Sequence, residues 1–183
     1  LGLAIMAFVI YPLLITLSIK NMTWKKFLSG MRDAQITAFS TSSSVATLPV
    51  TMKCVEEKLG VSERTTSFVL PIGATVNMDG TSLYQAIAVV ALAQFHMVDL
   101  SFSQQAIIVL TATLASIGAA AIPSAGLVLM IIVLESVGLN PAWIALIFPI
   151  DRILDMCRTV VNVTGDSTVS TLVAASEGEL SEV

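Results

Sequence analysis

The sequence predicts an all-helical membrane protein built from transmembrane helices, two re-entrant helical hairpins and one broken helix. Of its 183 residues, 55% are hydrophobic and 12% are charged, which is about half the charged share of a soluble domain. Residues 1–19, 100–134 and 136–150 carry no charge, and residues 65–98 contain only Asp79. Because a bilayer core takes about 20 apolar residues as a helix, these runs indicate several membrane segments.

The composition also argues against several classes of function. The formal net charge is −4, and no basic patch interleaved with aromatic residues supports nucleic-acid binding. Cys54 and Cys157 are too few and too far apart to indicate a disulfide framework or a zinc site. We therefore expect neither a nucleic-acid partner nor a bound cofactor.

Residues 1–29 are expected to form a transmembrane helix followed by a cytoplasmic loop. The apolar run 1–19 lacks the basic start and the cleavage site of a signal peptide, so we interpret it as a spanning helix. Basic residues follow it directly, namely Lys20, Lys25, Lys26 and Arg32. Because loops rich in Lys and Arg stay in the cytoplasm, this helix is predicted to run from outside to inside.

Residues 30–60 are expected to form the first re-entrant hairpin. Their centre, AFSTSSSVATLP, consists of small and hydroxylated residues and has apolar sequence on both sides. A flexible serine-rich linker is an alternative, but apolar flanks are unusual for a linker. A hairpin whose tip is buried inside the protein accounts for both features.

Residues 61–99 are expected to form a discontinuous membrane helix. Pro71, Gly73 and Gly80 interrupt an apolar run of helix length. The polar residues Asn77 and Asp79 lie between these helix breakers. In a broken membrane helix the freed backbone carbonyls can face a cation.

Residues 100–139 are expected to form a second re-entrant hairpin, although two short spans are an alternative. Two apolar arms flank the tip GAAAIPSAG, and each arm is too short to cross a bilayer. Pro49 of the first tip precedes Asn77, and Pro123 of the second tip precedes Asp151, by the same number of residues. This spacing favours the inverted repeats of a secondary transporter.

Residues 140–175 predict a helix with a buried polar stripe, and residues 176–183 form an acidic tail. At about 100° per residue, the stripe covers an arc of about 80°. It contains Asp151, Asp155, Arg158, Asn162 and Asp166, with Thr159 at its border. Local ion pairs are one explanation, but they leave Asp79 and Asp166 without a cation. Because a buried charge costs about 2.5–3.5 kcal/mol, a bound hard cation such as Na⁺ is favoured.

The same stripe offers two charged groups to an organic ligand. Asp155 can hold an ammonium group, and Arg158 can hold a carboxylate in a two-pronged geometry. Together they predict an acidic amino acid. An aspartyl protease would need two adjacent aspartates, whereas Asp155 and Asp166 lie about 16 Å apart along one helix. We therefore expect no enzyme, and no residue pattern here indicates a channel pore.

The motifs STSSS…LP, NMDGT, GAAAIPSAG and DMCRTVVNVTGD follow the order found in sodium-coupled glutamate/aspartate transporters. The chain resembles the C-terminal half of this family, which comprises the excitatory amino acid transporters and their prokaryotic relatives. The resemblance implies elevator-type symport of L-aspartate or L-glutamate with Na⁺, with the second hairpin as the gate. It also implies a multi-pass homotrimer in the lipid bilayer of the plasma membrane, with N-terminal helices outside this chain. A proton-coupled carrier of acidic amino acids or C4-dicarboxylates is the alternative.

The resemblance implies a role for each residue of the substrate site. Arg158 would bind the side-chain carboxylate of the substrate, and Asp155 its α-amino group. The backbone of the second hairpin would close over the substrate at Ile122 and Gly126. The other expected substrate contacts are Asn162, Thr159, Thr81, Ser43 and Ser44.

The resemblance also implies sodium sites built from carboxylate, amide and carbonyl oxygens. The first is expected at Asp166, Asn162 and the carbonyls of Asn77 and Gly73. The second is expected near the Met78 sulfur, at the carbonyls of Thr75, Ser116, Ile117 and Ala119. A third would combine Asp79 and Asn77 with a helix outside this chain. Gln85 stands where animal members have a glutamate linked to proton coupling, so we expect coupling to sodium without protons.

Overall fold

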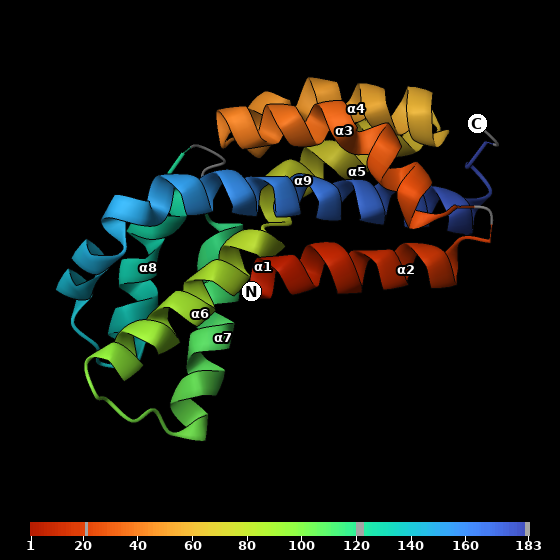
Figure 1. The fold of residues 1–183 in the computed structure, drawn as a ribbon. Coiled ribbons are helices and arrows are strands. Elements are labelled where there is room, and N and C mark those ends of the chain that lie inside the picture. The colour runs from red at the N-terminus through yellow and green to blue at the C-terminus, as the bar shows by residue number, and fades with distance from the viewer. Residues whose placement is uncertain (21, 120–122, 182–183) are drawn as a thin grey trace.

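The chain is all helical in the computed structural model, which describes residues 1–20, 22–119 and 123–181 (Figure 1). Within these residues there is no β-strand, and the one isolated bridge that they contain pairs Val61 with Leu180. The expectation of an all-α fold is therefore confirmed. No helix in the described part of the chain combines the length and the apolar character needed to cross a membrane.

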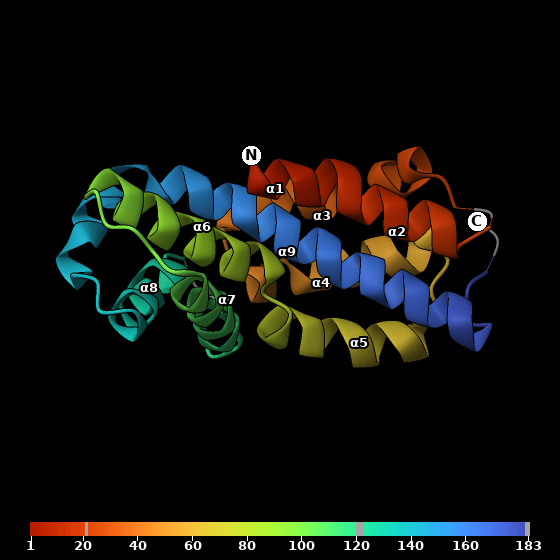
Figure 2. The same cartoon turned by 90° about the horizontal axis from the view of Figure 1, so that it is seen from below.

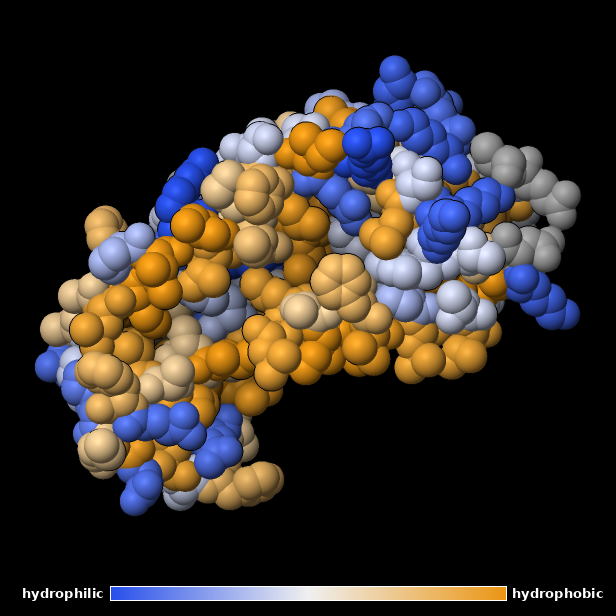
Figure 3. Space-filling model, viewed as in Figure 1, coloured by the Kyte–Doolittle hydropathy of each residue, from blue (hydrophilic) through white to orange (hydrophobic). Residues whose placement is uncertain are grey.

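The chain begins with one helical run that contains a π-helical turn. Its parts are α1 (Gly2–Ile5), the π turn η1 (Met6–Ile10) and α2 (Tyr11–Ser18). In a regular α-helix the N–H of residue 12 would donate to the carbonyl of Phe8, but Pro12 has no N–H. The turn directly before it is π-helical, with more residues per turn than an α-helix. Exposed apolar side chains form much of its outer surface (Figure 3), among them Phe8, Leu13 and Leu17.

The helices α3 (Trp24–Thr41) and α4 (Ser44–Leu59) pack against each other as an antiparallel pair (Figure 1). The hydroxyl groups of Thr23 and Ser43 accept hydrogen bonds from first-turn amides of the two helices, which satisfies otherwise unpaired donors. Ser42 reverses the chain between the helices in the left-handed region, with φ of 52°. This tight turn brings the serine-rich tip against the rest of the molecule.

The next two helices, α5 (Glu63–Val76) and α6 (Asp79–Phe95), are separated by a short break. Asn77 and Met78 leave the helical conformation there, and Asn77 has φ of −88° and ψ of 84°. This interruption is the one that the sequence predicts. It places the polar residues of the NMDGT motif at a helix end inside the protein.

A second helix pair consists of α7 (Phe102–Ile117) and α8 (Ala125–Ser136), which pack against each other and against α6. A reciprocal capping box between Ser101 and Gln104 starts α7, which satisfies two first-turn donors at once. Apolar side chains of the three helices meet in one core that includes Ile108, Met130 and Leu134. The centre of the connecting tip, residues 120–122, lies outside the described residues.

The chain then forms the 3-10 turn η2 (Pro141–Leu146) and the long helix α9 (Phe148–Glu177). All five residues of the predicted polar stripe are buried, with exposed fractions between 1% and 4%: Asp151, Asp155, Arg158, Asn162 and Asp166. The burial expected for this stripe is therefore confirmed.

Toward its C-terminal end, α9 buries hydroxyl groups instead of charges. Ser167, Thr168 and Thr171 donate hydrogen bonds of 2.7–2.8 Å to carbonyls four residues earlier in the same helix. Such bonds are a common way for hydroxyl groups to be satisfied within a helix. The small side chains also let neighbouring helices approach α9 closely.

The helix α9 runs through the middle of the molecule, and the other helices surround it (Figures 1 and 2). In the view of Figure 1, the pair α3–α4 lies on one side of it and α1–α2 on the other. The helices α6, α7 and α8 gather near its N-terminal half. The serine turn, the helix break and the start of α8 consequently approach α9 from different directions.

The segment that follows α9 is attached to the loop between α4 and α5. The carboxylate of Glu179 accepts hydrogen bonds from the hydroxyl groups of Ser62, at 2.5 Å, and Thr65, at 2.6 Å. The amide of Ser181 donates to the carbonyl of Gly60 at 2.8 Å. These bonds fix the end of α9 relative to the first helix pair.

This attachment is expected to be sensitive to acid. The hydroxyl groups of Ser62 and Thr65 hold the pKa of Glu179 below its ordinary value. The resulting stabilisation is present above the pKa of a glutamate in an unfolded chain, about 4.3. It is lost as the pH falls through the lower pKa of the folded state. We therefore expect the amide of Ser181 to lose protection from hydrogen exchange below about pH 4.

Two variants test this prediction. Glu179→Gln should lower the protection of the Ser181 amide at neutral pH and make it independent of acidification. Glu177→Gln, which changes a nearby exposed carboxylate, should keep the behaviour of the original protein. Constant protection of that amide down to about pH 3 in the unmodified protein would contradict the assignment.

Candidate functional site

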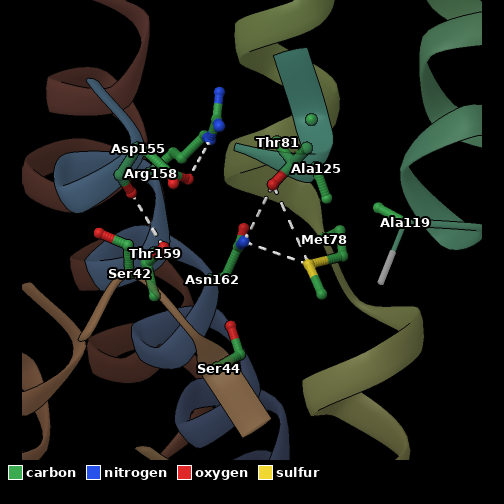
Figure 4. A pocket seen from close by; sticks show the side chains of 11 residues that line it. Ser42, Ser44, Met78, Thr81, Ala119, Ala125, Asp155, Arg158, Thr159 and Asn162 are labelled. Atoms are coloured by element: carbon green, nitrogen blue, oxygen red, sulfur yellow. Dashed lines mark hydrogen bonds and ion pairs between the residues drawn. The ribbon is translucent and has the colours of Figure 1, made fainter. Parts of the chain in front are cut away.

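A buried cavity lies where the serine turn, the helix break and the start of α8 meet α9 (Figure 4). The helix α9 contributes Asp155, Arg158, Thr159 and Asn162 to its lining. The other elements contribute Ser42, Ser44, Met78, Thr81, Ala119, Ala125 and Gly126. The volume open to the centres of water molecules is about 20 Å³, which is room for about one water. The cavity is therefore small, and most of the residues that line it are polar.

Arg158 is the largest fully buried side chain in the described part of the chain. Its Nε donates to Asp155 Oδ1 at 2.8 Å, and its Nη1 donates to Asp151 Oδ1 at 3.3 Å. Its Nη2 is buried and has no hydrogen-bond partner among the described residues. A buried donor without a partner is costly, so the guanidinium is prepared to bind an additional acceptor.

Tyr84 and Asp151 also contact Arg158. The hydroxyl of Tyr84 donates to Asp151 Oδ1 at 2.9 Å. The Arg158 guanidinium carbon lies 4.4 Å from the centre of the Tyr84 ring, a distance at which a cation and an aromatic face attract each other. The orientation of the guanidinium is thus fixed by α6 as well as by α9.

The first turn of α8 closes the cavity through backbone contacts. The amide of Ser124 donates to Asp155 Oδ2 at 2.7 Å, and Gln85 Nε2 donates to the carbonyl of Gly126 at 2.8 Å. A Cβ atom on Gly126 would lie 2.8 Å from Thr81 Cγ2 and 3.3 Å from Arg158 Cζ. A side chain at this position would collide with Thr81, so glycine allows the first turn of α8 to pack against Thr81 and Arg158.

Asn162 connects α9 to the break between α5 and α6 (Figure 4). Its Nδ2 donates to Thr81 Oγ1 at 3.1 Å and to the Met78 sulfur at 3.3 Å. Its Oδ1 accepts from the amide of Gly80 at 2.7 Å, and a Cβ atom on Gly80 would lie 2.6 Å from the Arg158 carbonyl. A single amide side chain thus joins the cavity to the NMDGT motif.

Two carboxylates lie beyond Asn162, on the side away from Arg158: Asp166, which is buried, and Asp79, which is partly buried. Asp166 Oδ1 accepts a hydrogen bond from Asn77 Nδ2 at 2.9 Å, and it lies 2.7 Å from where a Cβ atom of Gly73 would be. Asp79 accepts from the amide of Gly80 at 2.9 Å and from the hydroxyl of Tyr11. Among the described residues, neither carboxylate forms an ion pair with Lys or Arg.

The charges of this region therefore fall into two groups. Local ion pairs join Arg158 to both Asp151 and Asp155, in line with the alternative explanation of the stripe. Ion pairing does not account for Asp79 and Asp166, because neither carboxylate has a Lys or Arg partner in the described part of the chain. Carboxylate, amide and carbonyl oxygens near them are the ligands that hard cations such as Na⁺ prefer.

The structure brings together most of the residues expected at a substrate site. Arg158, Asp155, Asn162, Thr159, Thr81, Ser44 and Gly126 all line the cavity. Ser43 is not among the lining residues, because its hydroxyl caps α4. Ile122 lies outside the described residues.

The residues expected at the sodium sites are less closely grouped. Asp166, Asn77 and Gly73 adjoin one another, whereas Asn162 bonds to Gly80, Met78 and Thr81. The second predicted group has varied surroundings. Ala119 lines the cavity, whereas Ile117 is 45% exposed. The hydroxyl groups of Ser116 and Thr75 donate to backbone carbonyls of their own helices, at Thr113 for Ser116 and at Pro71 and Ile72 for Thr75.

Several residues at the site are absent from the sequence-based assignment. Ser42 lines the cavity, Tyr84 contacts Arg158, and Tyr11 contacts Asp79. Tyr84 could have been found from the helical period, since it lies three and four residues after Thr81 and Gly80. For Tyr11 the only signal is the proline that follows it, so its role becomes visible only in the structure.

Comparison with known proteins gives consistent matches. Residues 1–176 match the sodium:dicarboxylate symporter family. Excitatory amino acid transporter 1 of Rattus norvegicus is 55% identical over 166 residues, which are 91% of this chain and 30% of the relative. An excitatory amino acid transporter of Caenorhabditis elegans is 52% identical over 166 residues, which are 91% of this chain and 33% of the relative. The chain thus spans about a third of the length of the curated relatives it matches.

Proposed function

The chain belongs to the sodium:dicarboxylate symporter family, and on this premise we propose that it carries the substrate and cation sites of a sodium-coupled symporter for acidic amino acids. The family resemblance expected from the four sequence motifs is confirmed. Because the matched family and the similar proteins are transporters, the chain is not an enzyme.

The observation that supports this proposal most directly is the buried guanidinium of Arg158. Its Nη2 has no partner among the described residues and lies in a site lined by hydroxyl and amide groups. A carboxylate would satisfy that donor and Nη1 together in a two-pronged geometry. Asp155 lies beside it, and within the described residues its Oδ2 accepts a hydrogen bond from the backbone amide of Ser124, at the start of α8. These groups suit the side-chain carboxylate and the ammonium group of aspartate or glutamate.

The two carboxylates without ion pairs support the sodium part of the proposal. Asp79 and Asp166 are held by amide and hydroxyl donors, which leaves their negative charge uncompensated. Sodium would supply the missing charge. Coupling would arise because Asn162 contacts both the cavity and the NMDGT motif, so that ordering one site orders the other, and the effect must be reciprocal.

The pair α7–α8 is assigned the role of the gate. With room for about one water, the cavity must open before an amino acid can enter. Among the described residues, two hydrogen bonds join the start of α8 to the rest of the site, at Ser124 and Gly126. We assign the rest of the arrangement by analogy with the family. The pairs α3–α4 and α7–α8 would be re-entrant hairpins related by an inverted repeat, and transport would use elevator motion. The full protein would be a multi-pass homotrimer in the lipid bilayer of the plasma membrane, with N-terminal helices outside this chain.

The proposal is tested by calorimetric binding of L-aspartate and L-glutamate to the full-length protein, with sodium or with choline in the buffer. Binding of either amino acid is expected only in sodium. Equal binding in choline, with uptake that follows a proton gradient, would indicate the proton-coupled carrier instead. Absence of binding in both buffers would contradict the proposal as a whole.

Asp155→Ser is expected to change the class of substrate. It removes the carboxylate that would face the substrate ammonium group, so affinity for amino acids should fall by about 10- to 100-fold, the value of a lost charge-assisted bond. Dicarboxylates without an amine should then compete better than aspartate. Asp99→Ser changes an exposed carboxylate between α6 and α7 and serves as the control. A retained preference for amino acids in Asp155→Ser would refute this role.

A further inference from the structure

We infer that the hydroxyl of Tyr11 competes with sodium for the carboxylate of Asp79 and so sets how much sodium the protein needs. This inference rests on the proposed function, because it concerns the same cation. Tyr11 comes from α2, whereas Asp79 begins α6, and the contact joins parts of the chain that are distant in sequence.

The hydroxyl of Tyr11 has two acceptors and one proton. It donates to Asp79 Oδ2, and the backbone carbonyl of Val161 lies 3.2 Å away as a second acceptor. The side chain is 3% exposed, so water does not readily replace either bond. The proton can therefore rotate from the carboxylate to the carbonyl without leaving an unpaired donor.

Two features of the backbone make this contact possible. The π turn η1 ends directly before Tyr11, and such a turn changes the face of the helix on which the following side chains lie. On the opposite side, a Cβ atom on Gly165 would lie 2.7 Å from both Asp79 Oδ2 and the Tyr11 hydroxyl. Only glycine at this position of α9 leaves room for the pair.

In the absence of a cation, this hydrogen bond is the main polar support of Asp79 Oδ2. A bond from a hydroxyl to a carboxylate is about twice as strong as one between neutral groups. When sodium binds the carboxylate, the proton must turn toward Val161, because a positive ion and a donated proton cannot occupy the same side of the oxygen. Breaking the bond opposes sodium binding and raises the sodium concentration required.

Tyr11→Phe removes the hydroxyl and keeps the ring. In the full-length protein, the sodium concentration that gives half-maximal L-aspartate binding is expected to fall about tenfold, the factor for loss of one such bond. Aspartate affinity at saturating sodium should not change, because the aspartate site keeps all its groups. Ile15→Val, a change to a buried residue one turn further along α2, should leave both values unaltered.

A second replacement retains both the ring and the hydroxyl. With 3-fluorotyrosine at position 11, a stronger donor, the half-maximal sodium concentration should rise. If the original protein binds aspartate without sodium, or not at all, the proposed function and this inference both fail. If its binding requires sodium but Tyr11→Phe leaves the half-maximal concentration unchanged or raises it, only the inference fails.

Discussion

Arg158→Cys is expected to abolish measurable binding of L-aspartate and L-glutamate to the full-length protein. In this variant the side-chain carboxylate of the substrate would be buried at the site without the guanidinium that pairs with it. Truncating one partner of a buried charge pair typically costs about 3–5 kcal/mol, which corresponds to at least a 100-fold loss of affinity. Any binding that remains should favour neutral amino acids.

The same variant is expected to lose stability, because Asp151 and Asp155 both pair with Arg158 and would be left as buried carboxylates. Thermal unfolding therefore has to accompany the binding assay, so that loss of folding is recognised. Arg152→Cys changes an exposed arginine on the same helix and should affect neither measurement. Aspartate affinity that is equal in Arg158→Cys and in the original protein would rule out the substrate assignment.

Asp166→Asn is expected to raise the sodium concentration required for aspartate binding by at least about tenfold. At an effective dielectric constant near 20, two unit charges about 4 Å apart interact with about 4 kcal/mol. A third of that value already corresponds to a tenfold change. The substitution preserves the size of the side chain, and it removes the charge that has no ion pair among the described residues.

The control for Asp166→Asn is Asp99→Asn, which neutralises an exposed carboxylate in the loop between α6 and α7. The aspartate affinity at saturating sodium should remain similar in both variants. A sodium titration of Asp166→Asn that coincides with that of the original protein would show that this carboxylate holds no coupled cation.

The helices that carry the site could be predicted because their sequence patterns are unusually strong. Five polar residues within an arc of about 80° have no explanation on a membrane helix except burial, and the structure buries all five. The break at Asn77 and Met78 follows from helix breakers around polar residues, since proline and glycine both disfavour a continuous helix. In both cases the deciding information is local in sequence.

The partners of these residues could not be predicted because they come from other helices. Tyr84 and Tyr11 reach Arg158 and Asp79 across contacts that only the packed structure defines. The sequence also does not show which of the adjacent residues Ser42 and Ser43 faces the cavity. The left-handed turn at Ser42 makes Ser43 the cap of α4 and leaves Ser42 facing the cavity.

The hydroxyl groups of Ser167, Thr168 and Thr171 are bonded to carbonyls of their own helix. None of these three bonds has to be exchanged when α9 shifts along its neighbours, so these hydroxyl groups do not hold the helix to any other element. Shear between packed helices proceeds by small slides of this kind. At Ser167, Thr168 and Thr171, α9 can therefore slide past its neighbours without exchanging hydrogen bonds, and the bonds that oppose a slide lie on either side of this stretch, at Asp166 and Glu179.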